Sequence, residues 1–114
     1  MHEIAITQSI LNIALTAARE QGASRIRVIR LDVGAFSGIV PECVEMYLNV
    51  LAEGTIAQAA KIEFRRMPVR ILCCDCGQEG EITEKKLECP HCGSLRLKRL
   101  SGRECTVESL EVDS

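Results

Sequence analysis

The sequence predicts an α+β fold: a small sheet of about three strands with two helices, and a cysteine-rich module inserted before the last strand. Three observations predict it. Apolar residues recur at helical spacing near the N-terminus, and a segment in which apolar and polar residues alternate follows that helix. Two pairs of cysteines then interrupt the chain between strand-like segments. A chain of 114 residues is long enough for one compact domain and such a module.

Two helices are predicted in the first half of the chain. The first covers residues 4–20, with Gly22 behind it as a stop signal. The second begins at Pro41, because proline fits the first turn of a helix. The side chains predicted to be buried are Ile4, Ile10, Leu11, Ala14, Leu15 and Ala18 in the first helix, and Val44, Leu48 and Leu51 in the second.

Three segments read as strands: residues 26–33, 62–64 and 105–112. In the first, Ile29, Leu31 and Val33 share one face. Between the last two strands lies the cysteine-rich stretch 73–92, which is turn-like and polar. We interpret it as an inserted module and expect the last strand to return and pair in the sheet. The predicted organisation is one domain made of residues 1–68 and 102–114, and a second made of residues 69–101.

Composition limits the compartment and the kind of core. Hydrophobic residues make up 46% of the chain, with two Phe and one Tyr, so aliphatic residues must fill the core. No apolar run approaches the roughly 20 residues of a membrane span, and the N-terminus lacks the pattern of a signal peptide. We therefore expect a cytoplasmic protein. Seven cysteines in that reducing compartment favour metal binding over disulfides.

Four of the cysteines have the spacing of a metal site. Cys73 and Cys76 form one Cys-x2-Cys pair, and Cys89 and Cys92 form another after an intervening twelve residues. Two such knuckles complete a tetrahedral set of four thiolates, which predicts a structural Zn(II) in a zinc ribbon, with no open position for catalysis. A rubredoxin-type iron site uses the same ligands and stays an alternative.

The other cysteines and the nearby histidine receive simpler interpretations. Cys74 competes with Cys73 as a ligand. A Cys74-x-Cys76 pair, with one residue between the cysteines, is less well spaced to bind one ion than the Cys73-x2-Cys76 pair. Cys43 and Cys105 are interpreted as core residues of a helix and a strand. His91 lies inside the second knuckle, as an exposed side chain or a spare ligand.

The N-terminus permits a second kind of metal chemistry. The amine of Met1, the amide nitrogen and imidazole of His2, and the amide nitrogen of Glu3 can chelate one ion, in a planar set that suits nickel(II) or copper(II). This requires that Met1 is retained and that nothing is fused to it.

With these features in view, the sequence resembles the HypA/HybF family of hydrogenase-maturation nickel metallochaperones over essentially its whole length. The segments that carry the resemblance are the opening Met-His-Glu-Ile, Val33-Gly-Ala-Phe-Ser-Gly38, Gly54-Thr-Ile-Ala57, the two cysteine pairs, and Glu108-Ser-Leu-Glu-Val112. Of these segments, only the cysteine pairs are specific by themselves. The resemblance rests on the order and spacing of all the segments together.

The resemblance implies a function and partners. It implies that His2 is the essential nickel ligand, with Met1 and Glu3 contributing backbone nitrogens, and that Ni(II) is a transient cargo beside a structural Zn(II). It further implies delivery to the large subunit of [NiFe] hydrogenase with a HypB-type GTPase, a link to urease accessory proteins in some relatives, and a monomer or weak homodimer.

Two other classes of function are less consistent with the sequence. A zinc-ribbon nucleic-acid binder is permitted by residues 61–103, which carry ten basic and six acidic side chains. The net charge of −2 and the scarcity of aromatics for base stacking count against it. An enzyme finds no support, because two histidines offer no catalytic pairing and the zinc has no open position. The sequence therefore predicts a protein that is not an enzyme and binds neither nucleic acid nor membrane.

Overall fold

The computed structural model describes residues 2–83 and 85–114, apart from the side chain of His2. The elements are α1 (His2–Glu20), β1 (Arg25–Gly34), α2 (Pro41–Leu51), β2 (Lys61–Met67), β3 (Val69–Cys73), β4 (Glu79–Ile82), β5 (Leu97–Arg99) and β6 (Cys105–Asp113). They form two compact units. The first contains the chain up to Asp32, Ile39–Arg65 and Thr106–Ser114; the second contains Val33–Gly38 and Arg66–Cys105.

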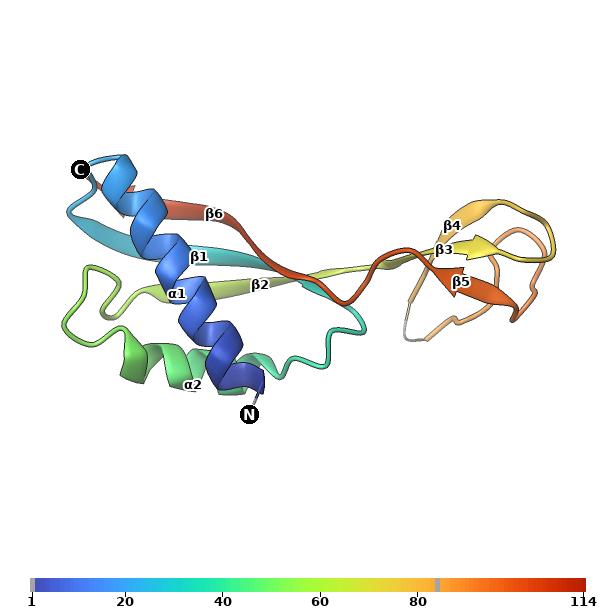
Figure 1. The fold of residues 1–114 in the computed structure, drawn as a ribbon, viewed down its shortest axis with the longest axis horizontal. Helices are drawn as coiled ribbons and strands as arrows, with labels where there is room; N and C mark the ends of the chain where they lie inside the picture. The colour runs from blue at the N-terminus through green and yellow to red at the C-terminus, as the bar shows by residue number, and fades with distance from the viewer. Residues whose placement is uncertain (1, 84) are drawn as a thin grey trace. The chain divides into compact units, whose positions relative to one another are not determined.

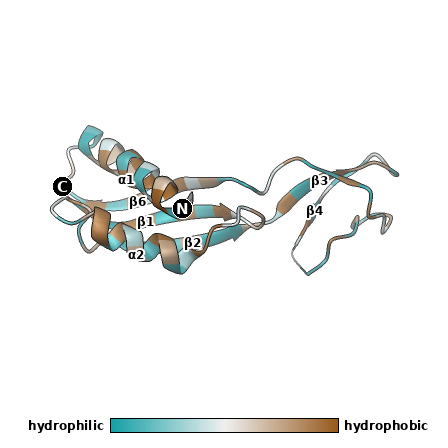
Figure 2. Ribbon diagram, turned by 60° about the horizontal axis from the view of Figure 1, so that its bottom comes forward, coloured by the Kyte–Doolittle hydropathy of each residue, from teal (hydrophilic) through white to brown (hydrophobic). Residues whose placement is uncertain are grey.

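The first unit is a three-stranded sheet with a layer of two helices. Its strand order is β2-β1-β6, so the last strand of the chain does return to the sheet, as predicted (Figure 1). Both helices alternate hydrophobic and hydrophilic residues along their length (Figure 2), as expected for helices with one face against a sheet. The α+β prediction with two helices is confirmed.

The core of this unit lies between the helices and the sheet. β1 buries Ile29, Leu31 and Val33 on one face as the alternation predicts, although Val33 itself belongs to the second unit. The buried apolar residues contributed by the helices are Ile10, Leu11, Ala14 and Ala18 in α1, and Val44 and Leu48 in α2. Leu15 and Leu51 are only partly buried.

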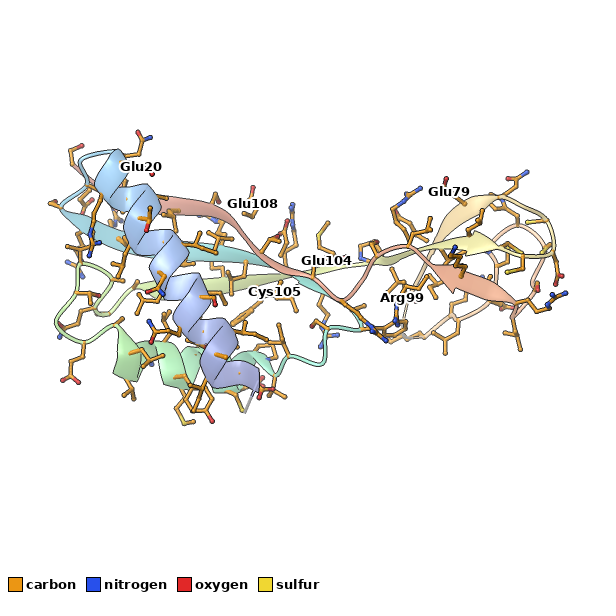
Figure 3. The ribbon with its side chains drawn as sticks, viewed as in Figure 1. Glu20, Glu79, Arg99, Glu104, Cys105 and Glu108 are labelled. Carbon is orange, nitrogen blue, oxygen red and sulfur yellow. The ribbon has the colours of Figure 1, made fainter. Side chains whose placement is uncertain are left out.

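The bounds of the helices differ little from the prediction, but the burial of one residue in α1 was predicted wrongly. α1 begins at His2 and ends at Glu20, which Figure 3 labels, and α2 begins at Pro41 as expected. The expectation that Ile4 is buried is wrong, because its side chain is 46% exposed. The buried stripe of α1 starts one turn later, at Thr7, which is fully buried.

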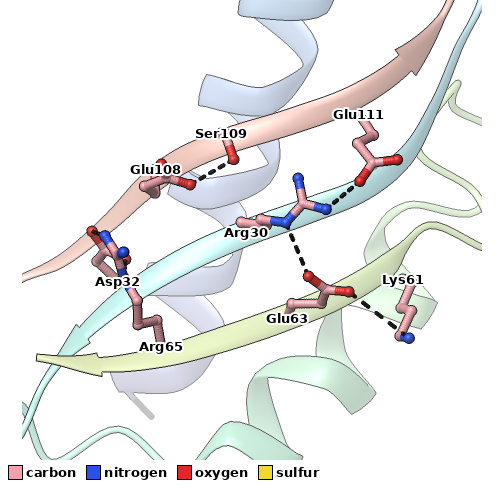
Figure 4. A network of polar contacts seen from close by, with 8 residues as sticks. All are labelled: Arg30, Asp32, Lys61, Glu63, Arg65, Glu108, Ser109 and Glu111. Atoms are coloured by element: carbon pink, nitrogen blue, oxygen red, sulfur yellow. Dashed lines mark hydrogen bonds and ion pairs between the residues drawn. The ribbon is translucent and has the colours of Figure 1, made fainter.

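The face of the sheet opposite the helices is covered by ion pairs (Figure 4). Arg65 Nε and Nη2 donate to the two carboxylate oxygens of Asp32 at 2.8 and 2.9 Å. Arg30 donates to Glu63 at 3.0 Å and also to Glu111, and so joins all three strands. The two β1–β2 pairs have the same sequence separation, which is the pattern of parallel strands.

These pairs make the sheet slightly more stable at neutral than at acid pH. Hydrogen bonding to Arg65 lowers the pKa of Asp32, and hydrogen bonding to Arg30 lowers the pKa of Glu111. A carboxyl group whose pKa is lowered by folding stabilises the fold at pH values above its pKa in the unfolded state. That stabilisation is lost as the pH falls through its pKa in the folded state. The pairs face solvent, so each contributes little.

The second unit is built on a smaller sheet with the order β4-β3-β5. β3 pairs antiparallel with β4, Val69 facing Ile82, and with β5, Ile71 facing Arg99. Its buried apolar cluster consists of Val69, Ile71 and Ile82, with Ala35, Phe36 and Leu97 packed against it. None of these three short strands was predicted from the sequence, and one of them, β4, lies within the stretch 73–92 that was expected to be turn-like.

Residues 33–38 complete the second unit through backbone hydrogen bonds. The amide of Gly34 donates to Glu104 O at 2.7 Å, that of Ala35 to Met67 O at 3.0 Å, and that of Phe36 to Gly102 O at 2.9 Å. A Cβ atom built at Gly34 would overlap the carbonyl of Gly102. Glycine is therefore required at position 34 by the close approach of two backbones.

Gly34→Ala is expected to destabilise the protein by at least about 2 kcal/mol, because a methyl group cannot be accommodated against backbone atoms. Urea unfolding monitored by circular dichroism measures the loss. The matched control is Gly54→Ala. Gly54 has φ +81° but nothing within 4 Å of its Cβ position, so only backbone strain of about 1 kcal/mol is expected there. Equal losses in the two variants would contradict the close-approach argument.

Candidate metal centres

The first cysteine pair lies in a knuckle at the end of β3. Cys73 is the last residue of that strand. Its amide donates to Gln78 O at 2.9 Å, and the amide of Gly77 donates back to Cys73 O at 3.0 Å. Gly77 has φ +72°, which closes the turn, and the amide of Cys76 points at Cys73 Sγ, 3.4 Å away.

The second pair repeats this geometry. The amide of Cys89 donates to Ser94 O at 2.8 Å, and the amide of Gly93, with φ +77°, donates to Cys89 O at 2.9 Å. The amide of His91 lies 3.4 Å from Cys89 Sγ. Two equivalent turns, each with an amide aimed at its first sulfur, present their thiols in the same way.

The knuckles bring the sulfurs of Cys73, Cys76, Cys89 and Cys92 within 4.8 Å of one another. The separations are 3.6 Å between Cys73 and Cys92 and 3.7 Å between Cys76 and Cys89. A disulfide would need about 2.05 Å. Four sulfurs at about 2.3 Å from one ion would lie about 3.8 Å apart. The cluster therefore has the dimensions of a tetrahedral four-thiolate metal site.

The protonation of the cluster favours a cation. The amide of Cys76, the main cause, lowers the pKa of Cys73 to about 6. The pKa of Cys92 rises to about 12 despite the hydrogen bond from Ser94, because the neighbouring sulfurs disfavour a second negative charge. Four thiols this close can all ionise only if a positive ion balances them, so binding must release protons.

The remaining candidates lie outside this cluster. Cys74 is exposed, and its amide donates to Arg96 O at 2.8 Å, so Cys73 rather than Cys74 shares the group of four sulfurs. The imidazole Nε2 of His91 is 3.2 Å from Glu79 O and contacts β4 instead. Cys43 and Cys105 are partly buried, and burial raises the pKa of the Cys105 thiol.

Two of the three predicted nickel ligands, His2 and Glu3, are the first residues of α1. Met1 and the side chain of His2 lie outside the described residues. The backbone of His2 is helical, and Glu3 follows in the first turn. The hydroxyl of Thr7 donates to Glu3 O at 2.5 Å. Amides in the first turn of a helix have no acceptor within the helix, so the nitrogens of His2 and Glu3 are not used by helical hydrogen bonds.

Comparison with known proteins supports the resemblance seen in the sequence. A family model described as hydrogenase/urease nickel incorporation, metallochaperone, hypA matches residues 1–112. The chain belongs to the HypA family. Hydrogenase maturation factor HypA from Aquifex aeolicus is 37% identical over 113 residues, 99% of this chain and 98% of that protein. The HypA of Moorella thermoacetica is 39% identical over 111 residues, 97% and 98% of the two chains.

Solved structures share the fold. The solution structure of the Ni metallochaperone HypA from Helicobacter pylori matches with a TM-score of 0.72 and 18% identity, over 98% of this chain and 97% of that one. A second solution structure of a HypA protein matches with a TM-score of 0.72 and 20% identity, over 98% of this chain and 96% of that one. HypA proteins are metallochaperones for hydrogenase maturation, not enzymes, as predicted. None of the described helices is long and apolar enough to cross a membrane.

The assignment of the cluster is tested by removing one sulfur at a time. Cys76→Ser is expected to lose the tightly bound ion, because a hydroxyl cannot replace a thiolate ligand, whereas Cys74→Ser should retain one ion per chain. Elemental analysis of the purified variants, with thiol counting before and after chelator treatment, measures this. Loss of the ion from Cys74→Ser with retention in Cys76→Ser would contradict the assignment.

Proposed function

We propose that this protein binds Ni(II) at its N-terminus and delivers it to the large subunit of [NiFe] hydrogenase during maturation, with a structural Zn(II) in the four-cysteine site. The observation that carries the proposal is the match to the nickel-incorporation family, which begins at residue 1 and so includes the Met-His-Glu start. The described structure adds two supports, one for each ion.

The nickel site is proposed to consist of the Met1 amine, the amide and imidazole of His2 and the amide of Glu3, with the Glu3 side chain shaping the site. The start of α1 supports it, because first-turn amides are not committed to helical hydrogen bonds. Nitrogen donors in a plane suit nickel(II). Since the imidazole is the one side-chain nitrogen in the set, His2 is the ligand on which the affinity should depend most.

The zinc site is proposed to be structural. Its four ligands, Cys73, Cys76, Cys89 and Cys92, leave no position for water or substrate, and their spacing fits the ion. The second unit would then need the ion for folding, since only three residues form its buried apolar cluster. We assign the nickel-binding domain to residues 1–68 and 102–114 and the zinc-binding domain to residues 69–101.

The partners proposed follow from the family. They are a HypB-type GTPase, the hydrogenase large subunit and, where urease is present, its accessory proteins. The family description names both hydrogenase and urease as recipients of nickel. A monomer or weak homodimer is the proposed oligomeric state.

His2→Ala is expected to abolish tight nickel binding while leaving the zinc content and the thermal unfolding unchanged, because it removes the one imidazole ligand and no core group. Isothermal titration of untagged protein with Ni(II), together with elemental analysis, measures both effects. An unchanged nickel affinity would exclude the proposed site.

A modified form separates the role of the amine from that of the imidazole. Acetylation of the N-terminus keeps His2 but converts the amine of Met1 into an amide, which removes the amine donor from the proposed chelate. Nickel affinity should fall here too, and the fold should persist. If the acetylated protein binds nickel as tightly as the parent, the amine is not a ligand.

Nickel affinity is also expected to fall on acidification from about pH 8 to about pH 6, the range in which amines and imidazoles gain protons. Protons compete with the ion for the same nitrogens, so the nickel affinity must fall as the proton concentration rises. Competition titrations with a nickel-selective dye at several pH values measure the slope. A pH-independent affinity would show that the ligands do not titrate in this range.

A further inference from the structure

The sheet of the second unit has two edges of opposite charge. On β4, Glu79 and Glu81 lie within 3.3 and 3.7 Å of the guanidinium of Arg70 on β3. On the other edge, β5 carries Lys98 and Arg99, and neither has an ion pair within 4 Å in the described part of the chain. Figure 3 shows Glu79 on the β4 side of this sheet and Arg99 on the β5 side. Backbone hydrogen bonds are the main cause of the lowered pKa of Glu104, and the charge of Arg99 contributes to it. Among the described residues neither Lys98 nor Arg99 is held in an ion pair, so both side chains can still contact a partner.

The β4 edge is partly closed by the second knuckle. The pairing of β3 with β4, with the Cys73 amide bonded to Gln78 O, places the carbonyl of Glu79 on the outer side of β4. The ring of His91 reaches that carbonyl at 3.2 Å. Pro90 packs on a face of the sheet at Gly80, where a Cβ atom would lie 2.8 Å from Pro90 Cγ. The contact of His91 hinders pairing with another strand at this edge.

The β5 edge has no such cover among the described residues. The amide of Leu100 donates to Arg70 O, and the amide of Cys74 donates to Arg96 O, both at 2.8 Å. In an antiparallel pair these bonds alternate, so the N–H and C=O of Arg99, which faces Ile71, point away from β3. Because β5 pairs only with β3, Arg99 presents its backbone groups to the outside.

Exposed apolar side chains flank the same edge. Leu95 is 78% exposed and Leu100 is 46% exposed, one on each side of β5. Basic strands with flanking leucines fit an extended peptide that carries carboxylates and an aliphatic side chain. They fit nucleic acid less well, because no aromatic side chain belongs to β5 or its flanks for base stacking.

We propose that the β5 edge of the second unit binds an extended acidic segment of a partner protein as an added strand. The backbone of Arg99 pairs with the segment, Lys98 and Arg99 meet its carboxylates, and Leu95 and Leu100 contact an aliphatic side chain. This site is separate from both proposed metal sites in its chemistry, so it does not depend on the nickel proposal.

The test uses the full, zinc-loaded chain and a displayed library of random eight-residue peptides. The enriched peptides are expected to combine acidic and aliphatic residues. Their affinity is then measured by fluorescence anisotropy for three variants. Arg99→Gln removes the charge, and Arg99→Pro removes in addition the outward N–H. Lys86→Glu reverses an exposed charge outside β5, in the segment that follows β4. Proline is tolerated at an edge position whose N–H faces solvent.

Binding should weaken in Arg99→Gln, weaken by a further factor of about ten in Arg99→Pro, as expected for one lost hydrogen bond, and stay unchanged in Lys86→Glu. Metal content and thermal unfolding report whether each variant is folded, and Lys98→Glu serves as a second charge test if Arg99→Pro is not. Equal affinity of Arg99→Pro and Arg99→Gln, or no enrichment of acidic peptides, would overturn the proposal. So would tighter, salt-sensitive binding of a single-stranded DNA 20-mer at the same residues.

Discussion

The geometry of the four sulfurs is the constraint on which the second unit depends. Val69, Ile71 and Ile82 are the members of its buried cluster, and much of the remaining chain is turn. Such a cluster buries too little apolar area to order two knuckles by itself. Four thiolates at separations such as 3.6 and 3.7 Å would repel one another, so the sulfurs can all ionise together only around a cation. With the proposed ion bound, the end of β3 would be tied to the second knuckle, and metal binding and folding of this unit would be one equilibrium.

The first unit has the opposite character. Its core is made of aliphatic side chains from two helices and a sheet, and its outer face is held by Arg30 and Arg65 with their carboxylate partners. No described residue of this core needs an ion. Under the proposed function, the start of α1 would gain and lose nickel without unfolding the domain, as transport of a cargo requires. The sulfur donors of one unit and the nitrogen donors proposed in the other would also favour different ions.

Much of this fold follows from local patterns in the sequence, and the misses have physical causes. The start of α2 at Pro41, the return of β6 and the gathering of the four cysteines were predictable from helix signals, alternation and spacing. β3, β4 and β5 were missed because they are short and lie among turn residues. The burial of Ile4 was wrong because periodicity shows which face is apolar but not where the neighbouring sheet ends. The pairing of Gly34 with Glu104, seventy residues later, has no local signal at all.

The two edges of the smaller sheet show how one metal site shapes the surface around it. The knuckle that supplies Cys89 and Cys92 also places Pro90 on a face of β4 and His91 at its outer edge, so ordering of the sulfurs hinders pairing at that edge. The same chain then continues into β5, which keeps its charges and the backbone of Arg99 exposed. An open edge is a liability for solubility, and natural proteins usually block it. The basic charge of the β5 edge repels the β5 edge of a second copy and favours an acidic strand. The residues that prevent self-association therefore also provide the selectivity for an acidic partner.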